Sequence, residues 1–170
     1  MRPVFLIGFM GAGKTTVGRL LASRMGIDFV DLDQEVAARE GESVDAIFRA
    51  RGEVGFRLAE RSALSGLATR ENTVVACGGG VVTDEGSRSI LETAGTTVYL
   101  AVSPEDAMAR IGSRTGGRPL LSAEPDSVAG LLASREALYL ETARFAVDTS
   151  GLSAEQVAER VGSLLGGPDA

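Results

Sequence analysis

The sequence contains no histidine and only one cysteine, Cys77, among its 170 residues. Without histidine, a general base must be a carboxylate or a lysine, and a metal site that depends on imidazole ligands is excluded. A single cysteine cannot form an intramolecular disulfide. It fits the reducing environment of the cytoplasm, where we expect the protein to be located.

Long apolar runs and an excess of positive charge are also missing. No apolar run approaches the roughly 20 residues that a membrane-spanning helix needs, and the net charge of −6 argues against a nucleic-acid partner. The composition, 44% hydrophobic and 24% charged, is typical of a globular domain. We therefore expect one domain over residues 1–170, without membrane or nucleic-acid partners, and a monomer because no apolar surface patch is evident.

Short apolar stretches alternate with helical patterns along the chain. Helix starts are marked by Ser103 before Pro104 and by a capping box at Ser153 and Gln156. This alternation predicts an α/β fold with three layers, a parallel sheet between two layers of helices, and ligands at the carboxyl ends of the strands. The predicted strands are four buried ones, Val4–Ile7, Phe29–Leu32, Thr73–Cys77 and Thr97–Val102, and a weaker one, Phe145–Asp148.

The segment from Gly8 to Thr15 matches the phosphate-binding pattern G-x-x-x-x-G-K-[ST] at every fixed position. It follows a predicted strand and precedes a helical pattern that begins at Lys14. In such a loop the backbone N–H groups cradle phosphates, the lysine reaches the β- and γ-phosphates, and the threonine hydroxyl ligates Mg²⁺. The alternative is a glycine-rich turn that binds nothing, which this context disfavours.

Two carboxylates, Asp31 and Asp33, lie at the end of the second predicted strand. Alternation along a strand would place both on the same side, facing the phosphate loop. One could then hold Mg²⁺ directly or through water, and the other could orient a substrate hydroxyl and accept its proton. Alternatively, Asp33 is only the N-cap of the following helix.

Three glycines, Gly78–Gly80, follow the third predicted strand. They would allow another backbone to approach, or present N–H groups to an anion or a hydroxyl. A tight turn from strand to helix explains them equally well. We interpret the preceding Cys77 as a buried strand residue rather than a redox group, because no neighbour in the sequence would lower its pKa.

Three arginines lie in different settings. Arg57 has Glu53 four residues before it and Glu60 three residues after it, a spacing that also fits a surface salt bridge. Arg118 lies in a basic, glycine-rich segment between two helical patterns, of the kind that kinases close over phosphates. Arg135 lies in a helical pattern, and nothing local distinguishes it from a solvated side chain.

Together these pieces closely resemble the shikimate kinase family, small P-loop kinases related to nucleoside monophosphate kinases. The resemblance covers nearly the whole chain, and its parts occur in the family's order. It implies transfer of the γ-phosphoryl group of ATP to the 3-hydroxyl of shikimate in aromatic amino-acid biosynthesis, and five parallel strands in the order 2-3-1-4-5. The matching pieces are Gly8–Thr16, Asp31-Leu32-Asp33, Phe56-Arg57 with Glu60, Gly78–Gly80, Arg118-Pro119-Leu120-Leu121, and Arg135 with Tyr139.

The resemblance also implies roles for individual residues toward ATP and Mg²⁺. Lys14 and Arg118 would act on the transferred phosphoryl group, and Thr15 with Asp31 would hold Mg²⁺, the latter from the outer shell. Arg110 would stack on adenine, and Ser150 belongs to the matching adenine-binding loop 149–153. The residues assigned to ATP are Gly11, Ala12, Gly13, Lys14, Thr15, Thr16, Arg110, Arg118 and Ser150.

Toward shikimate, the resemblance implies that Asp33 holds the attacking hydroxyl as a catalytic residue. Arg57 and Arg135 would clamp the substrate carboxylate, and Glu60 would orient Arg57. The residues assigned to shikimate are Asp33, Arg57, Glu60, Gly78, Gly79, Gly80, Arg118 and Arg135. We further expect a substrate lobe over about residues 33–61 and a lid over about 112–124 to move relative to the rest.

Two other readings stay open from the sequence. One is a different small-molecule kinase, such as a gluconate kinase or, less readily, a nucleoside monophosphate kinase. The other is a nucleotide-binding regulatory module without catalysis, which would require loss of Lys14, Asp33 or Arg118, and all three are present.

Overall fold

The computed structural model describes residues 1–112 and 125–166. In chain order, one or more helices separate each strand from the next, in agreement with the predicted α/β pattern. The strands are β1 (Val4–Ile7), β2 (Asp28–Asp31), β3 (Thr73–Ala76), β4 (Thr96–Ala101) and β5 (Phe145–Asp148). The helices are α1 (Lys14–Met25), α2 (Leu32–Glu40), α3 (Val44–Leu67), the 3₁₀ turn η1 (Val81–Thr83), α4 (Glu85–Ala94), α5 (Pro104–Gly112), α6 (Pro125–Thr142) and α7 (Ala154–Leu165).

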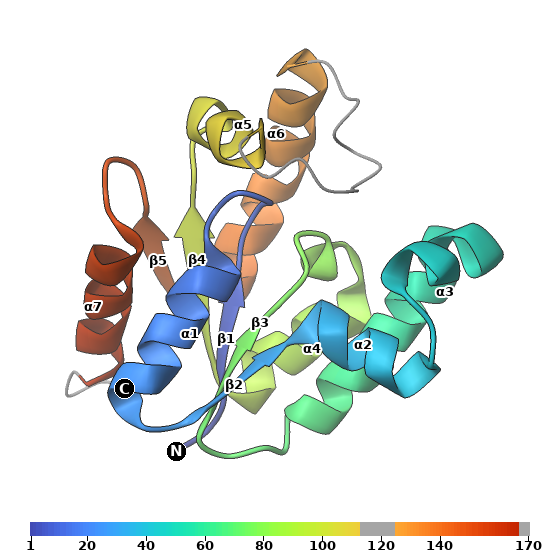
Figure 1. Ribbon diagram of the computed structural model, residues 1–170, viewed down its shortest axis with the longest axis horizontal. Helices are drawn as coiled ribbons and strands as arrows, with labels where there is room; N and C mark the ends of the chain where they lie inside the picture. Colours follow the sequence, from blue (N-terminus) through green and yellow to red (C-terminus); the bar gives the residue numbers. More distant parts are fainter. Residues whose placement is uncertain (113–124, 167–170) are drawn as a thin grey trace.

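All five strands are parallel and follow the order β2-β3-β1-β4-β5, as the resemblance implied. The central strand β1 pairs with both neighbours, so that Leu6 lies opposite Ala76 of β3 and Val98 of β4. Figure 1 shows α1 and α7 side by side on one face of the sheet, with α4 and α6 on the other. This order brings the carboxyl ends of β1, β2 and β3 to one edge, where the candidate site lies.

The second strand was predicted to be buried, and this prediction was wrong. Strand β2 lies at the edge of the sheet, pairs only with β3, and has exposed or half-buried side chains throughout. Leu32, predicted as its last residue, is instead the first residue of α2 and is fully buried. The apolar pattern marked the right segment, but Leu32 owes its burial to the helix rather than to the sheet.

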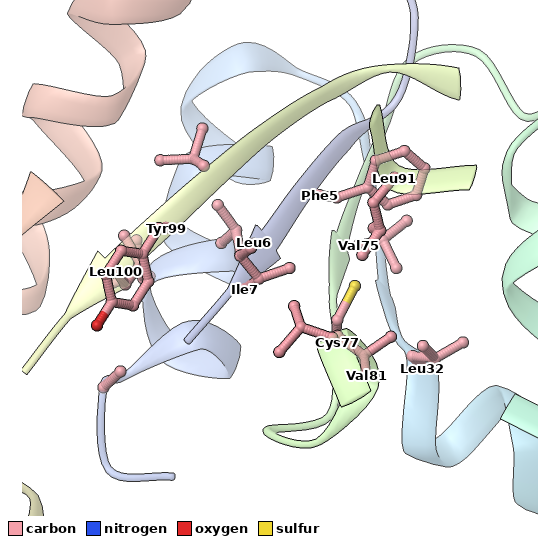
Figure 2. Close-up of a cluster of buried hydrophobic side chains, with 14 of the residues drawn as sticks. Phe5, Leu6, Ile7, Leu32, Val75, Cys77, Val81, Leu91, Tyr99 and Leu100 are labelled. Atoms are coloured by element: carbon pink, nitrogen blue, oxygen red, sulfur yellow. The ribbon is translucent and has the colours of Figure 1, made fainter. Parts of the chain in front are cut away.

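The core is formed by β1, β3 and β4 and the helices that cover them. Figure 2 shows Phe5 of β1 beside Leu91 and Val75, and the sulfur of Cys77 among neighbouring aliphatic side chains. Cys77 is buried, as the sequence predicted, and its burial raises the pKa of the thiol. A buried, protonated thiol is a packing group.

Local sequence signals explain where several helices begin. Ser103 accepts a hydrogen bond from the N–H of Asp106 at 3.1 Å, and Ser153 forms a reciprocal capping box with Gln156. One feature was not predicted: α3 is interrupted at Gly52, which has a φ of 66° and a ψ of −172°. This interruption divides α3 within the expected substrate lobe.

Within the described part of the chain, no helix has the length and apolar character needed to cross a membrane.

Candidate active site

The loop between β1 and α1 is held in its shape by two neighbouring elements. Gly8 has a φ of 143° and Gly11 a φ of 82°, which side chains rarely adopt. A Cβ atom on Gly8 would also lie 2.5 Å from the carbonyl oxygen of Leu100, and one on Gly11 would lie 2.9 Å from that of Ala107. The glycine pattern therefore reflects close packing of this loop against β4 and α5.

The amino end of α1 offers backbone donors to an anion. Gly13 is the N-cap and has no side chain to accept from the first N–H groups of the helix. Ala12, predicted with this group, is buried and donates its N–H to Phe9 O at 3.2 Å within the loop. Thr16 lies in the first helical turn. A loop of this kind at a helix N-terminus fits the phosphates of ATP.

Lys14 folds back over the same loop. Its Nζ donates to the carbonyl oxygens of Gly8 at 2.6 Å and Phe9 at 2.9 Å. These contacts hold the ammonium group beside the loop, where a triphosphate needs positive charge. Lys14 is thus preorganised by main-chain acceptors.

Thr15 and Asp31 form the oxygen pair that the sequence proposed for Mg²⁺. Thr15 Oγ1 donates to Asp31 Oδ2 at 3.0 Å, and Asp31 Oδ1 accepts from the N–H of Asp33 at 3.1 Å. Among the residues that the structure describes, no group of three or more acidic or cysteine side chains could hold a metal alone. This donor set fits Mg²⁺, which commonly uses one or two protein oxygens together with phosphates and water.

Asp33 lies on a helix, not on a strand. The strand ends at Asp31, which is itself the N-cap of α2, so both the strand alternation and the N-cap alternative for Asp33 were wrong. The Asp33 carboxylate still reaches the glycine turn. A Cβ atom on Gly78 would lie 3.0 Å from Asp33 Oδ1 and 2.8 Å from Glu60 Oε1. The two carboxylates therefore converge in front of Gly78.

Arg57 and Glu60 form a buried ion pair, which corrects the alternative of a surface salt bridge. Arg57 Nη1 donates to Glu60 Oε2 at 2.5 Å, and the exposed fractions of the two side chains are 14% and 0%. Glu53 is 60% exposed and lies 3.4 Å from Arg57, so only this second contact belongs to the surface. Within the described chain, Arg57 Nε and Glu60 Oε1 are buried without a hydrogen-bond partner.

Burial governs the protonation of Glu60. Desolvation raises its pKa from an ordinary 4.5 to about 7, although the Arg57 guanidinium opposes this, and the negative charges of Asp33 and Asp84 add to the rise. Glu60 therefore titrates near neutral pH beside the predicted substrate site.

The three glycines form a tight turn, as one sequence reading held, and side chains approach this turn closely; the binding of an anion or a hydroxyl by its N–H groups stays a prediction. Gly78 O accepts from Val81 N–H at 3.1 Å, and Gly80 O accepts from Thr83 N–H at 3.0 Å. A Cβ atom on Gly80 would overlap the Arg57 guanidinium. The turn thus leaves the space that Arg57 occupies.

Arg135 and Tyr139, one helical turn apart on α6, both reach Gly79. Its carbonyl oxygen accepts from Arg135 Nη1 at 3.3 Å and from the Tyr139 hydroxyl. Sequence reasoning gave Tyr139 no role of its own, although its spacing of four from Arg135 places both on one helix face.

Arg110 lies at the other end of the phosphate loop. Its Nη1 donates to Gly11 O and Thr149 Oγ1, and its Nη2 to Thr149 O, each at 3.2 Å. Ser150 is exposed, and its N–H bonds Asp148 Oδ1 at 2.9 Å. Arg110 therefore joins the phosphate loop to the predicted adenine loop. Arg118 lies outside the described residues, as does most of the predicted lid.

The sequence and the structure of this chain are both similar to those of known shikimate kinases. The sequence model of the shikimate kinase family matches residues 10–165. A shikimate kinase from Halorhodospira halophila is 43% identical over 166 residues, which cover 96% of this chain and 93% of that relative. The structure of the Acinetobacter baumannii shikimate kinase in complex with shikimate has a TM-score of 0.90 and 37% identity, covering 97% of this chain and 93% of that chain. The Bacteroides thetaiotaomicron shikimate kinase also has a TM-score of 0.90, with 32% identity and coverage of 96% and 98%. This chain belongs to the shikimate kinase family.

Proposed function

We propose that the protein transfers the γ-phosphoryl group of ATP to the 3-hydroxyl group of shikimate, with Mg²⁺ as the metal ion. The observation that carries this proposal is the meeting of a phosphate site and an acid site at one turn. A Cβ atom on Gly79 would lie 3.4 Å from the N atom of Met10 in the phosphate loop. The same residue bonds Arg135 through its carbonyl oxygen. A donor phosphate and an acid acceptor bound at these two places would be neighbours.

At the phosphate end, the chain provides position and charge. The N–H groups of the loop and the first turn of α1 would bind the phosphate oxygens, and Lys14 would exchange its two carbonyl contacts for the β- and γ-phosphates. Thr15 and Asp31 would hold Mg²⁺, which when bound neutralises charge on the phosphate oxygens. The proposed roles of Arg110, Ser150 and Arg118 toward ATP stay predictions.

At the acid end, the chain provides two guanidinium groups. Arg57 and Arg135 would bind the substrate carboxylate, since guanidinium matches carboxylate with paired hydrogen bonds. Glu60 accepts a hydrogen bond from Arg57 Nη1 and so fixes the position of the guanidinium group. Gly78 and Gly80 leave room for the Glu60 carboxylate and the Arg57 guanidinium, respectively.

Asp33 would accept the proton of the attacking hydroxyl. It is a carboxylate on the first turn of α2, and its Oδ1 faces the space before Gly78. The chain has no histidine that could take this role. The proton would pass from the hydroxyl to Asp33 as the oxygen bonds to phosphorus, and ADP would leave with the electron pair of the broken bond.

We also propose that the protein acts as a monomer in the cytoplasm, which its single buried cysteine and acidic composition support. Movement of the lobe over residues 33–61 and of the lid over 112–124 stays a prediction. If the protein is instead another small-molecule kinase, the roles proposed at the phosphate end still apply, but those proposed for the acid end do not.

A coupled assay of ADP release tests the proposed function. With Mg·ATP, we would compare shikimate, gluconate, AMP, CMP and no acceptor. We expect rapid turnover with shikimate alone. Turnover with gluconate or a nucleotide would keep the phosphate site but overturn the roles of Arg57 and Arg135. Tight ATP binding without turnover would favour a regulatory module.

A further inference from the structure

The carbonyl oxygen of Gly79 has two donors from α6. One is Arg135 Nη1 at 3.3 Å, and the other is the hydroxyl of Tyr139. These two residues differ in burial. Tyr139 is fully buried, whereas Arg135 is half-buried and borders the acid site. The carbonyl therefore joins one fixed donor to one donor that can turn toward a ligand.

Tyr139 is held firmly in place. Its ring stacks on that of Tyr99 of β4, with centroids 4.9 Å apart and an angle of 16° between the rings. Burial raises the pKa of Tyr139, so its hydroxyl keeps its proton and donates to the Gly79 carbonyl. The sheet, through Tyr99, thus fixes the hydroxyl that holds the glycine turn.

Arg135 faces a competition between two acceptors. To bind a carboxylate with paired hydrogen bonds, a guanidinium must direct two N–H groups at it. If Nη1 left Gly79 and no other donor remained, the carbonyl would lose its partner, which is costly for a part-buried group. The Tyr139 hydroxyl removes that cost because it stays on the carbonyl.

We propose that Tyr139 is a positioning residue for the acid substrate: its hydroxyl keeps the Gly79 carbonyl bonded and in place while Arg135 turns to the substrate carboxylate. Tyr139 does not touch the reacting atoms and acts through Gly79 and Arg135. This inference rests on the proposed function, since it concerns the same acid site.

The variant Tyr139→Phe tests the inference, with Tyr99→Phe as the matched control. Each variant removes one hydroxyl from the same ring stack. For Tyr139→Phe, we expect the KM for shikimate to rise about 5- to 20-fold, the effect of one lost hydrogen bond. The kcat and the KM for ATP should change less than about twofold. Tyr99→Phe should leave all three values within about twofold of the wild type.

A second background tests whether Tyr139 acts through Arg135. In Arg135→Ala, we expect Tyr139→Phe to raise the KM for shikimate by less than about twofold further. The full 5- to 20-fold rise in that background would overturn the inference. So would a lower melting temperature in Tyr139→Phe with an unchanged KM for shikimate, which would indicate a packing role alone.

Hydrogen exchange tests, without any substrate, whether the bond from Tyr139 to Gly79 holds the glycine turn in place. In the ligand-free Arg135→Ala protein, which lacks the other α6 donor to Gly79, amides of residues 77–84 should exchange faster when Tyr139→Phe is added than when Tyr99→Phe is added. Equal exchange rates with Tyr139→Phe and with Tyr99→Phe would show that Tyr139 does not hold the glycine turn, and would overturn the inference. If the wild type fails to turn over shikimate, the proposed function fails, and hydrogen exchange still decides whether Tyr139 holds the turn.

Discussion

The two ends of the candidate site, the phosphate end and the acid end, use different chemical groups. The phosphate end is mainly backbone from one continuous loop, and Lys14, which follows that loop, bonds two of its carbonyls. The acid end consists of charged side chains from α2, α3 and α6 around a glycine turn. Its main ion pair, Arg57 with Glu60, is buried. A local loop can bind any phosphate donor, whereas the scattered side chains can select one acceptor.

This difference has an energetic side. Backbone donors at a helix end carry partial charges that folding has already oriented. The acid end instead buries full charges, and a buried pair stabilises only while both partners are present. We therefore expect losses at the phosphate end to affect catalysis alone, and loss of either partner of the buried Arg57–Glu60 pair to affect substrate binding or stability.

The largest effect is expected for Lys14→Ala. This variant removes the one lysine charge from the phosphate loop, so kcat should fall about 10³-fold while the fold is kept. Steady-state kinetics measures kcat, and circular dichroism tests whether the fold is kept. Arg24→Ala, an exposed cation in the last turn of the same helix, is the control and should have little effect. Near-normal turnover in Lys14→Ala would contradict the assignment of the loop.

The next effect is expected for Asp33→Asn. It keeps the shape of the side chain but removes the proton acceptor, so kcat should fall by about 10²- to 10⁴-fold. Asp28→Asn, an exposed change on β2, serves as control. If only the KM for shikimate changes in Asp33→Asn, then Asp33 binds the substrate without accepting its proton.

A smaller and more selective effect is expected for Arg57→Ala. Loss of a charge-assisted contact should raise the KM for shikimate about 10- to 100-fold and that for ATP much less. Arg61→Ala is a matched control one turn further along α3, where Arg61 contacts Asp84 at 3.4 Å. Equal rises in both KM values for Arg57→Ala would show that Arg57 does not read the carboxylate.

The last prediction, for Glu60→Gln, concerns stability rather than kinetics, and the smallest effect on activity is expected for this variant. Below pH 4.5 Glu60 is protonated in both the folded and the unfolded state. As pH rises, the unfolded state loses this proton first, because folding raises the pKa to about 7. The free energy of unfolding should therefore fall by up to about 3 kcal/mol between pH 4.5 and pH 7 through this group, and stay lower above pH 7.

Urea unfolding between pH 5 and pH 8 measures this contribution as the difference between the wild type and Glu60→Gln. The variant should show a flatter dependence on pH. Glu53→Gln, which changes the exposed partner of Arg57, should keep the dependence of the wild type. A wild-type slope in Glu60→Gln would show that other groups cause the pH dependence.

The sequence predicted most strands and helices well because their signals were local, whereas the strand order came only from the family resemblance. Apolar segments and helix starts such as Ser153 lie within a few residues of the structure they specify. The errors came at β2, where burial depends on position in the sheet. No local pattern in the sequence indicates that β2 is an edge strand. Leu32 is buried because the helix that it begins packs against the core.

The same contrast holds for the site. The phosphate loop was predicted from eight consecutive residues, whereas the carboxylate-binding roles of Arg57 and Arg135 were predicted only through the family resemblance. Spacing alone could not show that Glu60 is buried while Glu53 is exposed, although both flank Arg57. The bond from Tyr139 to Gly79 spans 60 positions in the sequence, a separation at which spacing carries no signal.

The position of β1 in the sheet has a consequence for the order of folding. This strand is the first of the five along the chain, yet it is the central one in the sheet, and its two partners are residues 73–76 and 96–101. During synthesis, β1 must wait for β4 to emerge before both of its edges are paired. The phosphate loop, packed against Leu100 and Ala107, then takes its final shape only after both of these residues have left the ribosome.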